Sequence, residues 1–143
     1  MIEYLPLTFP SDNFIEIETL FKICQRLKVL SIFMFHLAGH EHCEEVKLDY
    51  GDKFARALIE FAPRTLELIK VTQYSWKFSL KALETLMESW KGRPALTIIG
   101  SDPDYENQGY INIINKYKRD GVLKDFKYDA DGDNYLFKDE MLI

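Results

Sequence analysis

A short apolar motif recurs along the chain. An apolar residue is followed by two others, a second apolar residue, one other and a third apolar residue. Four copies are clear: Ile2-x-x-Leu5-x-Leu7, Leu27-x-x-Leu30-x-Ile32, Leu66-x-x-Ile69-x-Val71 and Leu123-x-x-Phe126-x-Tyr128. Another copy lies in ALTIIGS and starts at Ala95 or Leu96, and we take Leu96-x-x-Ile99 as its register. The alternation within each copy predicts a short strand with one buried face.

A helical pattern precedes each strand after the first. The i, i+3, i+4, i+7 spacing of one helix face occurs in three sets: Phe54, Ala57, Leu58, Phe61; Leu83, Leu86, Met87, Trp90; and Tyr110, Ile113, Ile114, Tyr117. The stretch from Phe14 to Cys24 has helical period less strictly, after the N-cap candidates at 11–13. Gly92 and Gly121 follow two helices as C-cap candidates. Pro63 and Pro94 separate helix from strand.

The repeated strand–helix unit predicts the architecture. A single unit cannot bury its apolar face, so neighbouring units must stack, and parallel strands joined by helices coil right-handedly. We expect an α/β right-handed solenoid of four to five strand–helix units over residues 1–128, with parallel strands on the concave face. The unit, with its L-x-x-L-x-L strand and full helix, resembles a leucine-rich repeat. The wide spacing between the second and third motifs predicts an insertion loop at 36–49, and 129–143 forms an acidic C-terminal cap or tail. The alternative is a compact α/β domain with the same elements and no solenoid geometry.

Two segments carry a resemblance to a known family. LETLMESWKGRPALTI and INIINKYKRDGVLKDF resemble the degenerate leucine-rich repeats of fungal F-box proteins, through Trp90, Pro94 and the phrase from Lys116 to Lys124. Phe35 and Tyr74 stand where the family pattern often has Asn or Cys. The resemblance implies the substrate-recognition region of a ubiquitin ligase receptor. We find no F-box ahead of Ile2, so a Skp-type adaptor is implied only if an F-box lies upstream.

The concave face is the predicted partner-binding surface. Side chains alternate along a strand, so the x positions of the motif point away from the helices. We expect these positions to be exposed and to bind a protein partner: Glu3, Tyr4, Lys28, Val29, Ser31, Phe33, Glu67, Leu68, Lys70 and Thr72. The alternative is an ordinary surface with a few scattered apolar residues.

Two segments hold possible metal ligands. His36, His40, His42, Cys43, Glu44 and Glu45 supply the zinc ligand types, although their spacing matches no established finger. Asp129, Asp131, Asp133 and Glu140 fit positions 1, 3, 5 and 12 of a calcium loop, but its flanks do not supply the two helices of an EF-hand. A solvated loop and an acidic terminal turn are the favoured interpretations, and we expect no cofactor. A calcium- or metal-regulated binding protein stays open as an alternative, as does a stand-alone repeat scaffold.

Composition narrows the function classes. The 143 residues include 18 basic and 23 acidic side chains, a formal charge of -5, which disfavours nucleic-acid binding. The apolar stretch from Val29 to Phe35 is too short to cross a membrane, and two cysteines favour a reducing compartment, cytoplasmic or nuclear. Catalytic motifs such as G-x-S-x-G and H-E-x-x-H are absent from the sequence, so we do not expect an enzyme.

Overall fold

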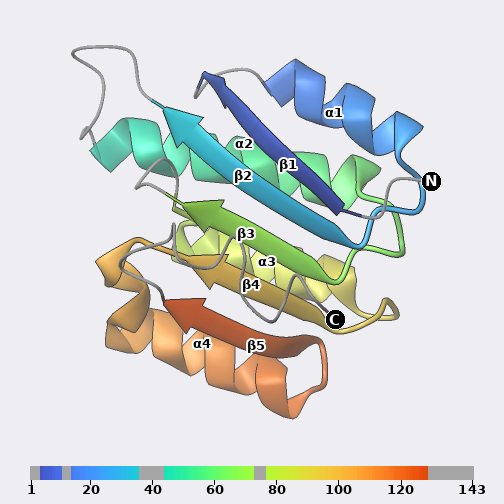
Figure 1. Cartoon of the computed structure of the whole chain (residues 1–143). Helices are drawn as coiled ribbons and strands as arrows, with labels where there is room; N and C mark the ends of the chain where they lie inside the picture. Colours follow the sequence, from blue (N-terminus) through green and yellow to red (C-terminus); the bar gives the residue numbers. More distant parts are fainter. Residues whose placement is uncertain (1–3, 11–13, 36–43, 73–76, 129–143) are drawn as a thin grey trace.

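The computed structural model describes residues 4–10, 14–35, 44–72 and 77–128, and Figure 1 shows their arrangement. Strands and helices alternate along these residues. The order is β1 (Tyr4–Pro10), α1 (Phe14–Ile23), β2 (Val29–Phe35), α2 (Glu44–Phe61), β3 (Leu68–Thr72), α3 (Leu80–Trp90), β4 (Leu96–Gly100), the short 3-10 helix η1 (Pro103–Glu106), α4 (Gln108–Arg119) and β5 (Leu123–Tyr128). The predicted α/β class is therefore confirmed.

The described strands form one parallel sheet of five strands in the order β1-β2-β3-β4-β5. Each strand thus pairs only with its neighbours in chain order. Helices α1 to α4 all lie on the same side of the sheet, behind it in Figure 1. We call the opposite side of the sheet the front face.

The core lies between the sheet and the helices. The alternating motif residues of the strands and the apolar faces of the helices meet there in one cluster. In α3 the fully buried residues are Leu83, Leu86, Met87 and Trp90, the four that the helical spacing predicts. Leu30, Ile32, Ile69 and Val71 are the strand residues predicted for this side, and all belong to the cluster.

Glycines end the two C-terminal helices as predicted. Gly92 follows α3 with φ 89°, and Gly121 follows α4 with φ 78°. This left-handed backbone favours glycine, because a Cβ atom would be strained there. Both turns lead directly into the next strand.

The predicted register of the fourth motif is wrong. Ile98, not Ile99, pairs with the core residue Ile69 and with Phe126, which packs against the core. Ile99 pairs with Lys70 and Lys127 and lies outside the core cluster. The repeat of this strand therefore follows the alternative register that starts at Ala95. Leu96 is nevertheless fully buried in the core, because the pairing of β4 with β5 shifts between Leu96 and Thr97. A local irregularity of this kind breaks the strict period of two.

The predicted insertion loop is also corrected. Helix α2 begins at Glu44, so residues 44–49 are helical and lengthen α2 to 18 residues. The remaining part of the expected loop, 36–43, lies outside the described residues. The expected tail at 129–143 lies outside them as well.

Side chains and backbone connect each unit to the next. The Thr65 hydroxyl, ahead of β3, donates a 2.7 Å hydrogen bond to the Leu27 carbonyl ahead of β2. The Tyr117 hydroxyl of α4 donates a 2.6 Å hydrogen bond to the Glu88 carboxylate of α3. These contacts fix neighbouring units relative to one another.

Candidate functional site

A groove of about 460 Å³ crosses the front face where β2 to β5 begin. Its lining includes the apolar residues Val29, Leu68 and Ala95, which we call the groove floor, together with Thr97. Val29, Leu68, Thr97 and Asp125 are direct partners in the strand register, so they form one row across four adjacent strands. The residues that follow them in each strand, Leu30, Ile69, Ile98 and Phe126, turn to the helix side. We call this depression the front-face groove.

Charged side chains border the front-face groove. Lys28 and Glu67 lie just before β2 and β3, and Lys124, Asp125 and Lys127 belong to β5. Backbone hydrogen bonds hold the entry to these strands. The Glu67 and Leu68 N–H groups donate to the Lys28 carbonyl at 2.8 and 3.0 Å, and the Thr97 N–H donates to the Glu67 carbonyl at 2.8 Å. The charged residues Lys28 and Glu67 therefore lie on hydrogen-bonded backbone and not on long loops.

A bulge gives β5 an additional lysine at the groove. Leu96 pairs with Leu123, but the next residue of β4, Thr97, pairs with Asp125. Lys124 is left as the extra residue between them, and its side chain is exposed. Bulges commonly redirect a side chain in this way. Asp125 and Lys127 then continue the front-face alternation.

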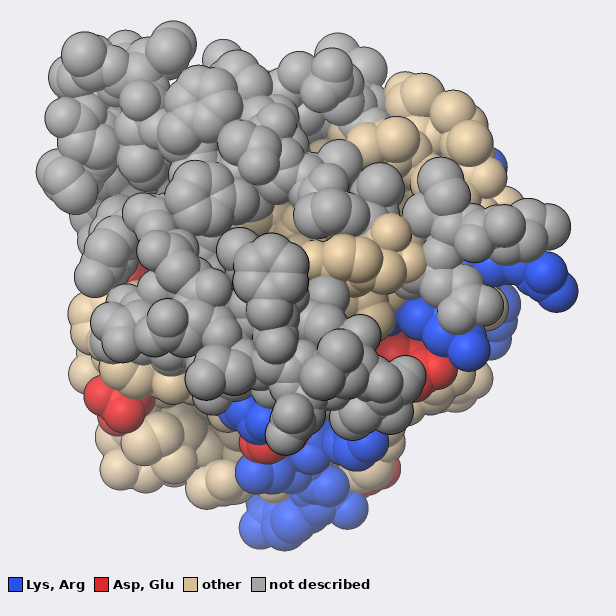
Figure 2. Space-filling model, viewed as in Figure 1, with Lys and Arg blue, Asp and Glu red and all other residues tan. Residues whose placement is uncertain are grey.

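The β5 end of the front-face groove is the more positive end. Asp125 lies 3.4 Å from the Lys118 ammonium and also accepts a 2.8 Å hydrogen bond from the Phe126 N–H. Neither Lys124 nor Lys127 makes an ion pair within the described residues. In Figure 2, Lys and Arg side chains gather at the lower edge of the molecule, where Figure 1 places β5 and α4. This end can therefore attract an anionic group.

Four of the predicted partner-binding residues line the front-face groove: Lys28, Val29, Glu67 and Leu68. Tyr4, 37% exposed, pairs with Val29 at the start of β1. The side chains of Glu3, Phe33 and Thr72 lie outside the described residues.

The expected exposure is wrong for three of the predicted residues. Ser31 and Lys70 are only 3% and 1% exposed, and Leu68 is 8% exposed. Ser31 and Lys70 lie in the next row, with Ile99, which is also buried. The alternation of a strand tells which face a side chain takes but not how much of that face is covered. The front face is accordingly open mainly at the strand starts.

The predicted surface did not include the C-terminal half of the front-face groove. Ala95, Thr97, Lys124, Asp125 and Lys127 were not among the predicted residues. Thr97 and Asp125 follow from extending the Val29–Leu68 row into the next strands. The predicted surface included only the first three copies of the motif, although Thr97, Lys124, Asp125 and Lys127 are x positions of the last two copies.

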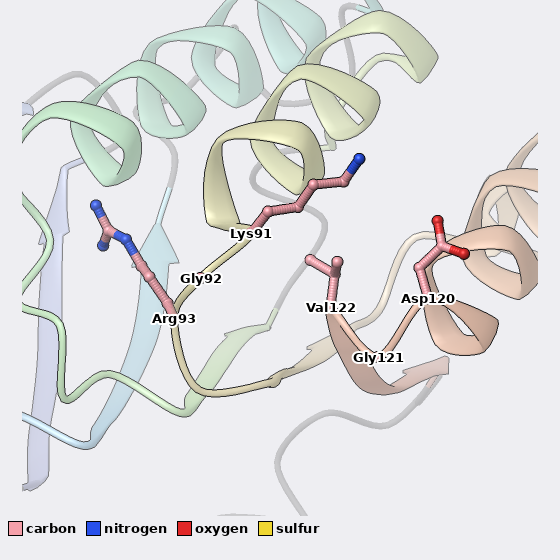
Figure 3. A pocket seen from close by; sticks show the side chains of 6 residues that line it. All are labelled: Lys91, Gly92, Arg93, Asp120, Gly121 and Val122. Atoms are coloured by element: carbon pink, nitrogen blue, oxygen red, sulfur yellow. The ribbon is translucent and has the colours of Figure 1, made fainter.

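A second depression lies between the two helix-to-strand turns, and Figure 3 shows its lining. Its volume is about 340 Å³. Lys91 and Arg93 leave the first turn in opposite directions, and each has its own partner. The Lys91 ammonium lies 3.0 Å from Glu88, and the Arg93 guanidinium donates to the Ala62 carbonyl at 3.2 Å and stacks 4.4 Å from the Trp90 ring. Both cations of the first turn are therefore engaged by these contacts.

Buried polar groups gather at the opposite ends of β3 and β4. The Lys77 ammonium pairs with the Asp104 carboxylate, and the Asp102 side chain accepts from the Asp104 N–H at 2.9 Å. The Phe78 N–H donates to the Tyr105 hydroxyl at 2.8 Å, and the Tyr110 hydroxyl donates to the Phe78 carbonyl at 2.6 Å. Burial raises the pKa of Tyr105 well above its usual value. These contacts anchor the segment before α3. Each of the polar side chains named here takes part in one of them.

The metal-binding hypotheses fall mostly outside the described residues. The side chains of the histidine and cysteine segment at 36–45 and of the acidic segment at 129–140 are not among those described. Elsewhere in the described part of the chain, no cluster of three or more His, Cys, Asp or Glu side chains could hold a metal ion. Among the same residues, no helix has the length and apolar character needed to cross a membrane.

Comparison with protein-family models, curated proteins and solved structures found no match to this chain. The front-face groove is therefore interpreted from its own geometry.

Proposed function

We propose that the chain is a protein-recognition module with a leucine-rich-repeat-like solenoid fold, and that the front-face groove binds the partner. The single observation that supports this function most is the groove itself, a row of residues shared by four consecutive strands. Chain-order pairing with all helices on one side supports the solenoid. Right-handed connections follow from the general rule for parallel strands.

The shape and chemistry of the front-face groove suit an extended polypeptide. Adjacent strands lie roughly 4.8 Å apart, so the row from Val29 to Asp125 spans roughly 14 Å. A chain that rises roughly 3.3 Å per residue would lay four to five residues across it. An apolar floor with a charged rim is the usual composition of a protein-binding patch. The groove runs across the face of four adjacent strands, and this layout suits an extended chain.

The link to a ubiquitin ligase is a finer proposal that rests on the sequence resemblance. In that proposal the chain is the substrate-recognition region of an F-box-type receptor. Sequencing the transcript upstream of Met1 tests it. An in-frame F-box supports a Skp-type adaptor as partner, and a stop codon directly upstream contradicts the ligase proposal and favours a stand-alone scaffold.

A peptide selection tests the groove function. Random peptides of about twelve residues, long enough to cross the row twice, are displayed and selected on the full chain. Binding of the selected peptides is then measured by fluorescence anisotropy. Val29→Glu places a charge on the groove floor, and we expect at least a tenfold weaker Kd.

The matched control is Ile23→Glu. Ile23 is 69% exposed on α1, behind the sheet, so the same type of change leaves the front face intact. Its Kd should equal that of the parent chain, and circular dichroism melting should show that both variants fold. Peptides that bind Val29→Glu as tightly as the parent chain would exclude the front-face groove as the binding site.

A further inference from the structure

The charges around the front-face groove are arranged asymmetrically. At the β2 end, Lys28 and Glu67 carry opposite charges. At the β5 end, Asp125 is offset by Lys118 at 3.4 Å, which leaves Lys124 and Lys127 as the excess. A ligand that lies along the row therefore meets a mixed end and a positive end.

We infer that the preferred ligand is an acidic peptide segment, with an Asp or Glu carboxylate at Lys124 and Lys127 and an apolar side chain over Val29 and Leu68. This inference rests on the proposed function of the front-face groove. The two anchoring positions are about two to three strand spacings apart, which corresponds to roughly three to four residues of extended chain. The expected sequence therefore has an apolar residue and an acidic residue separated by three or four positions.

Charge complementarity supports this ligand over other polyanions. A nucleic acid needs a continuous row of cations, because each phosphate contact replaces a counterion. Here Glu67 and Asp125 interrupt the row of lysines, and the whole chain has a formal charge of -5. A peptide with one or two carboxylates and intervening neutral residues avoids these acidic positions.

The fixed backbone of β5 positions the two lysines. Lys127 pairs through its backbone with Ile99 in the sheet, and Lys124 sits in the bulge opposite Leu96 and Thr97. Their Cα positions are thus set by the sheet, and only the side chains need to be ordered on binding. This arrangement reduces the entropy cost of capturing a carboxylate.

The test uses the selection on the full chain described above and reads the composition of the selected peptides. Residues 129–143 contain four Asp and one Glu, so the test has to exclude competition from this segment of the same chain. The selection is therefore repeated on a full-length variant with Asp129→Asn, Asp131→Asn and Asp133→Asn. We expect enrichment of Asp or Glu three or four positions from an apolar residue in at least one of the two selections.

The lysines are then tested with Lys124→Gln and Lys127→Gln together, against Lys53→Gln and Lys81→Gln on α2 and α3 as the charge-matched control. We expect the groove variant to weaken binding at least tenfold and to lose most of its dependence on salt between about 50 and 500 mM, because the screened charges are gone. The control should change neither quantity. Circular dichroism verifies folding of both.

The outcomes separate the two proposals. Selected peptides without acidic residues, which lose binding in Val29→Glu but not in the lysine variant, overturn the acidic-ligand inference and leave the groove function standing. If neither the parent chain nor the Asp→Asn variant selects peptides whose binding is weakened by Val29→Glu, both the groove function and the acidic-ligand inference are overturned. Acidic peptides that bind the lysine variant as tightly as the parent chain overturn the inference as well.

Discussion

The Tyr117 hydroxyl of α4 and the Glu88 carboxylate of α3 are 2.6 Å apart and share a hydrogen bond. Tyr117 is fully buried, whereas the carboxylate reaches the surface. The bond to Tyr117 and the nearby Lys91 lower the pKa of Glu88, and burial with this same carboxylate raises the pKa of Tyr117. Both directions favour one protonation state, a neutral tyrosine beside an ionised carboxylate.

Removal of this contact should give a pH-dependent loss of stability. A carboxyl group with a lowered folded-state pKa contributes stability above its unfolded pKa, and that contribution is lost as the pH falls through the folded value. We therefore expect Glu88→Gln to be less stable than the parent chain at pH 7, with the difference shrinking toward pH 3. Urea unfolding at several pH values measures this. A difference independent of pH would contradict the assignment.

Gly51 allows α2 to approach the segment before α3. A Cβ atom at this position would lie 2.0 Å from the Lys77 carbonyl oxygen, which is backbone and cannot swing aside. We expect Gly51→Ala to lower the free energy of unfolding by about 3 kcal/mol, at the upper end of the cost of overpacking. Thermal and urea denaturation provide the measurement.

Gly92→Ala is the comparison for Gly51→Ala. At Gly92 an added Cβ meets no atom within 4 Å, and only the φ of 89° is unfavourable. Its cost should be about 1 kcal/mol, the cost of a left-handed non-glycine residue. Equal effects of the two substitutions would show that α2 does not pack against Lys77 as described.

Ser79 caps α3 and also bonds to α2. Its hydroxyl oxygen accepts from the Ala82 N–H at 3.0 Å, and its hydroxyl lies 3.0 Å from the Asp52 carboxylate. We expect Ser79→Ala to cost about 1 to 2 kcal/mol in unfolding experiments. Ser89→Ala, at an exposed position within the same helix, should be neutral or slightly stabilising because alanine favours helix. A neutral Ser79→Ala would exclude the capping role.

The corrected register of β4 can be tested by cysteine labelling. Thr97 lies in the front-face groove and Ile98 is 2% exposed in the core. In a background with Cys43→Ser, we expect Thr97→Cys to react with a maleimide at least tenfold faster than Ile98→Cys, since a buried thiol reacts only after local opening. The native Cys24 is buried and should contribute little. Faster labelling at position 98 would restore the register that starts at Leu96.

The elements of this fold follow from the sequence wherever the hydrophobic period is regular. Leu30, Ile32, Ile69 and Val71 are buried as the alternation predicts, and the faces of α3 and α4 agree with their spacing. In ALTIIGS the apolar residues form two adjacent pairs, Ala95-Leu96 and Ile98-Ile99, so the period of two is ambiguous, and a bulge in the partner strand decides the register. The hydrophobic pattern of β4 alone does not show how this strand pairs with a bulged partner.

The candidate site could be predicted only in part. The sequence placed Lys28, Val29, Glu67 and Leu68 on the correct face, because alternation fixes the side of a strand. It predicted exposure for Ser31 and Lys70, which are buried, because exposure depends on what else packs nearby. Lys124 and Lys127 are x positions of the copy Leu123-x-x-Phe126-x-Tyr128, but they were missed because the predicted surface included only the first three copies of the motif.

The chain-order pairing of the five strands affects how the protein can form during synthesis. Each strand finds its partner in the unit made just before it, so the sheet can grow one unit at a time as the chain leaves the ribosome. In a sheet where a strand pairs with one much later in the sequence, the first strand stays unpaired until the later residues are synthesised. Its apolar surface is exposed during that time. Here every intermediate has a single growing edge, and the last strand added, β5, is the one that carries the lysines of the front-face groove. The lining of the front-face groove is therefore completed only when the growth of the described sheet ends.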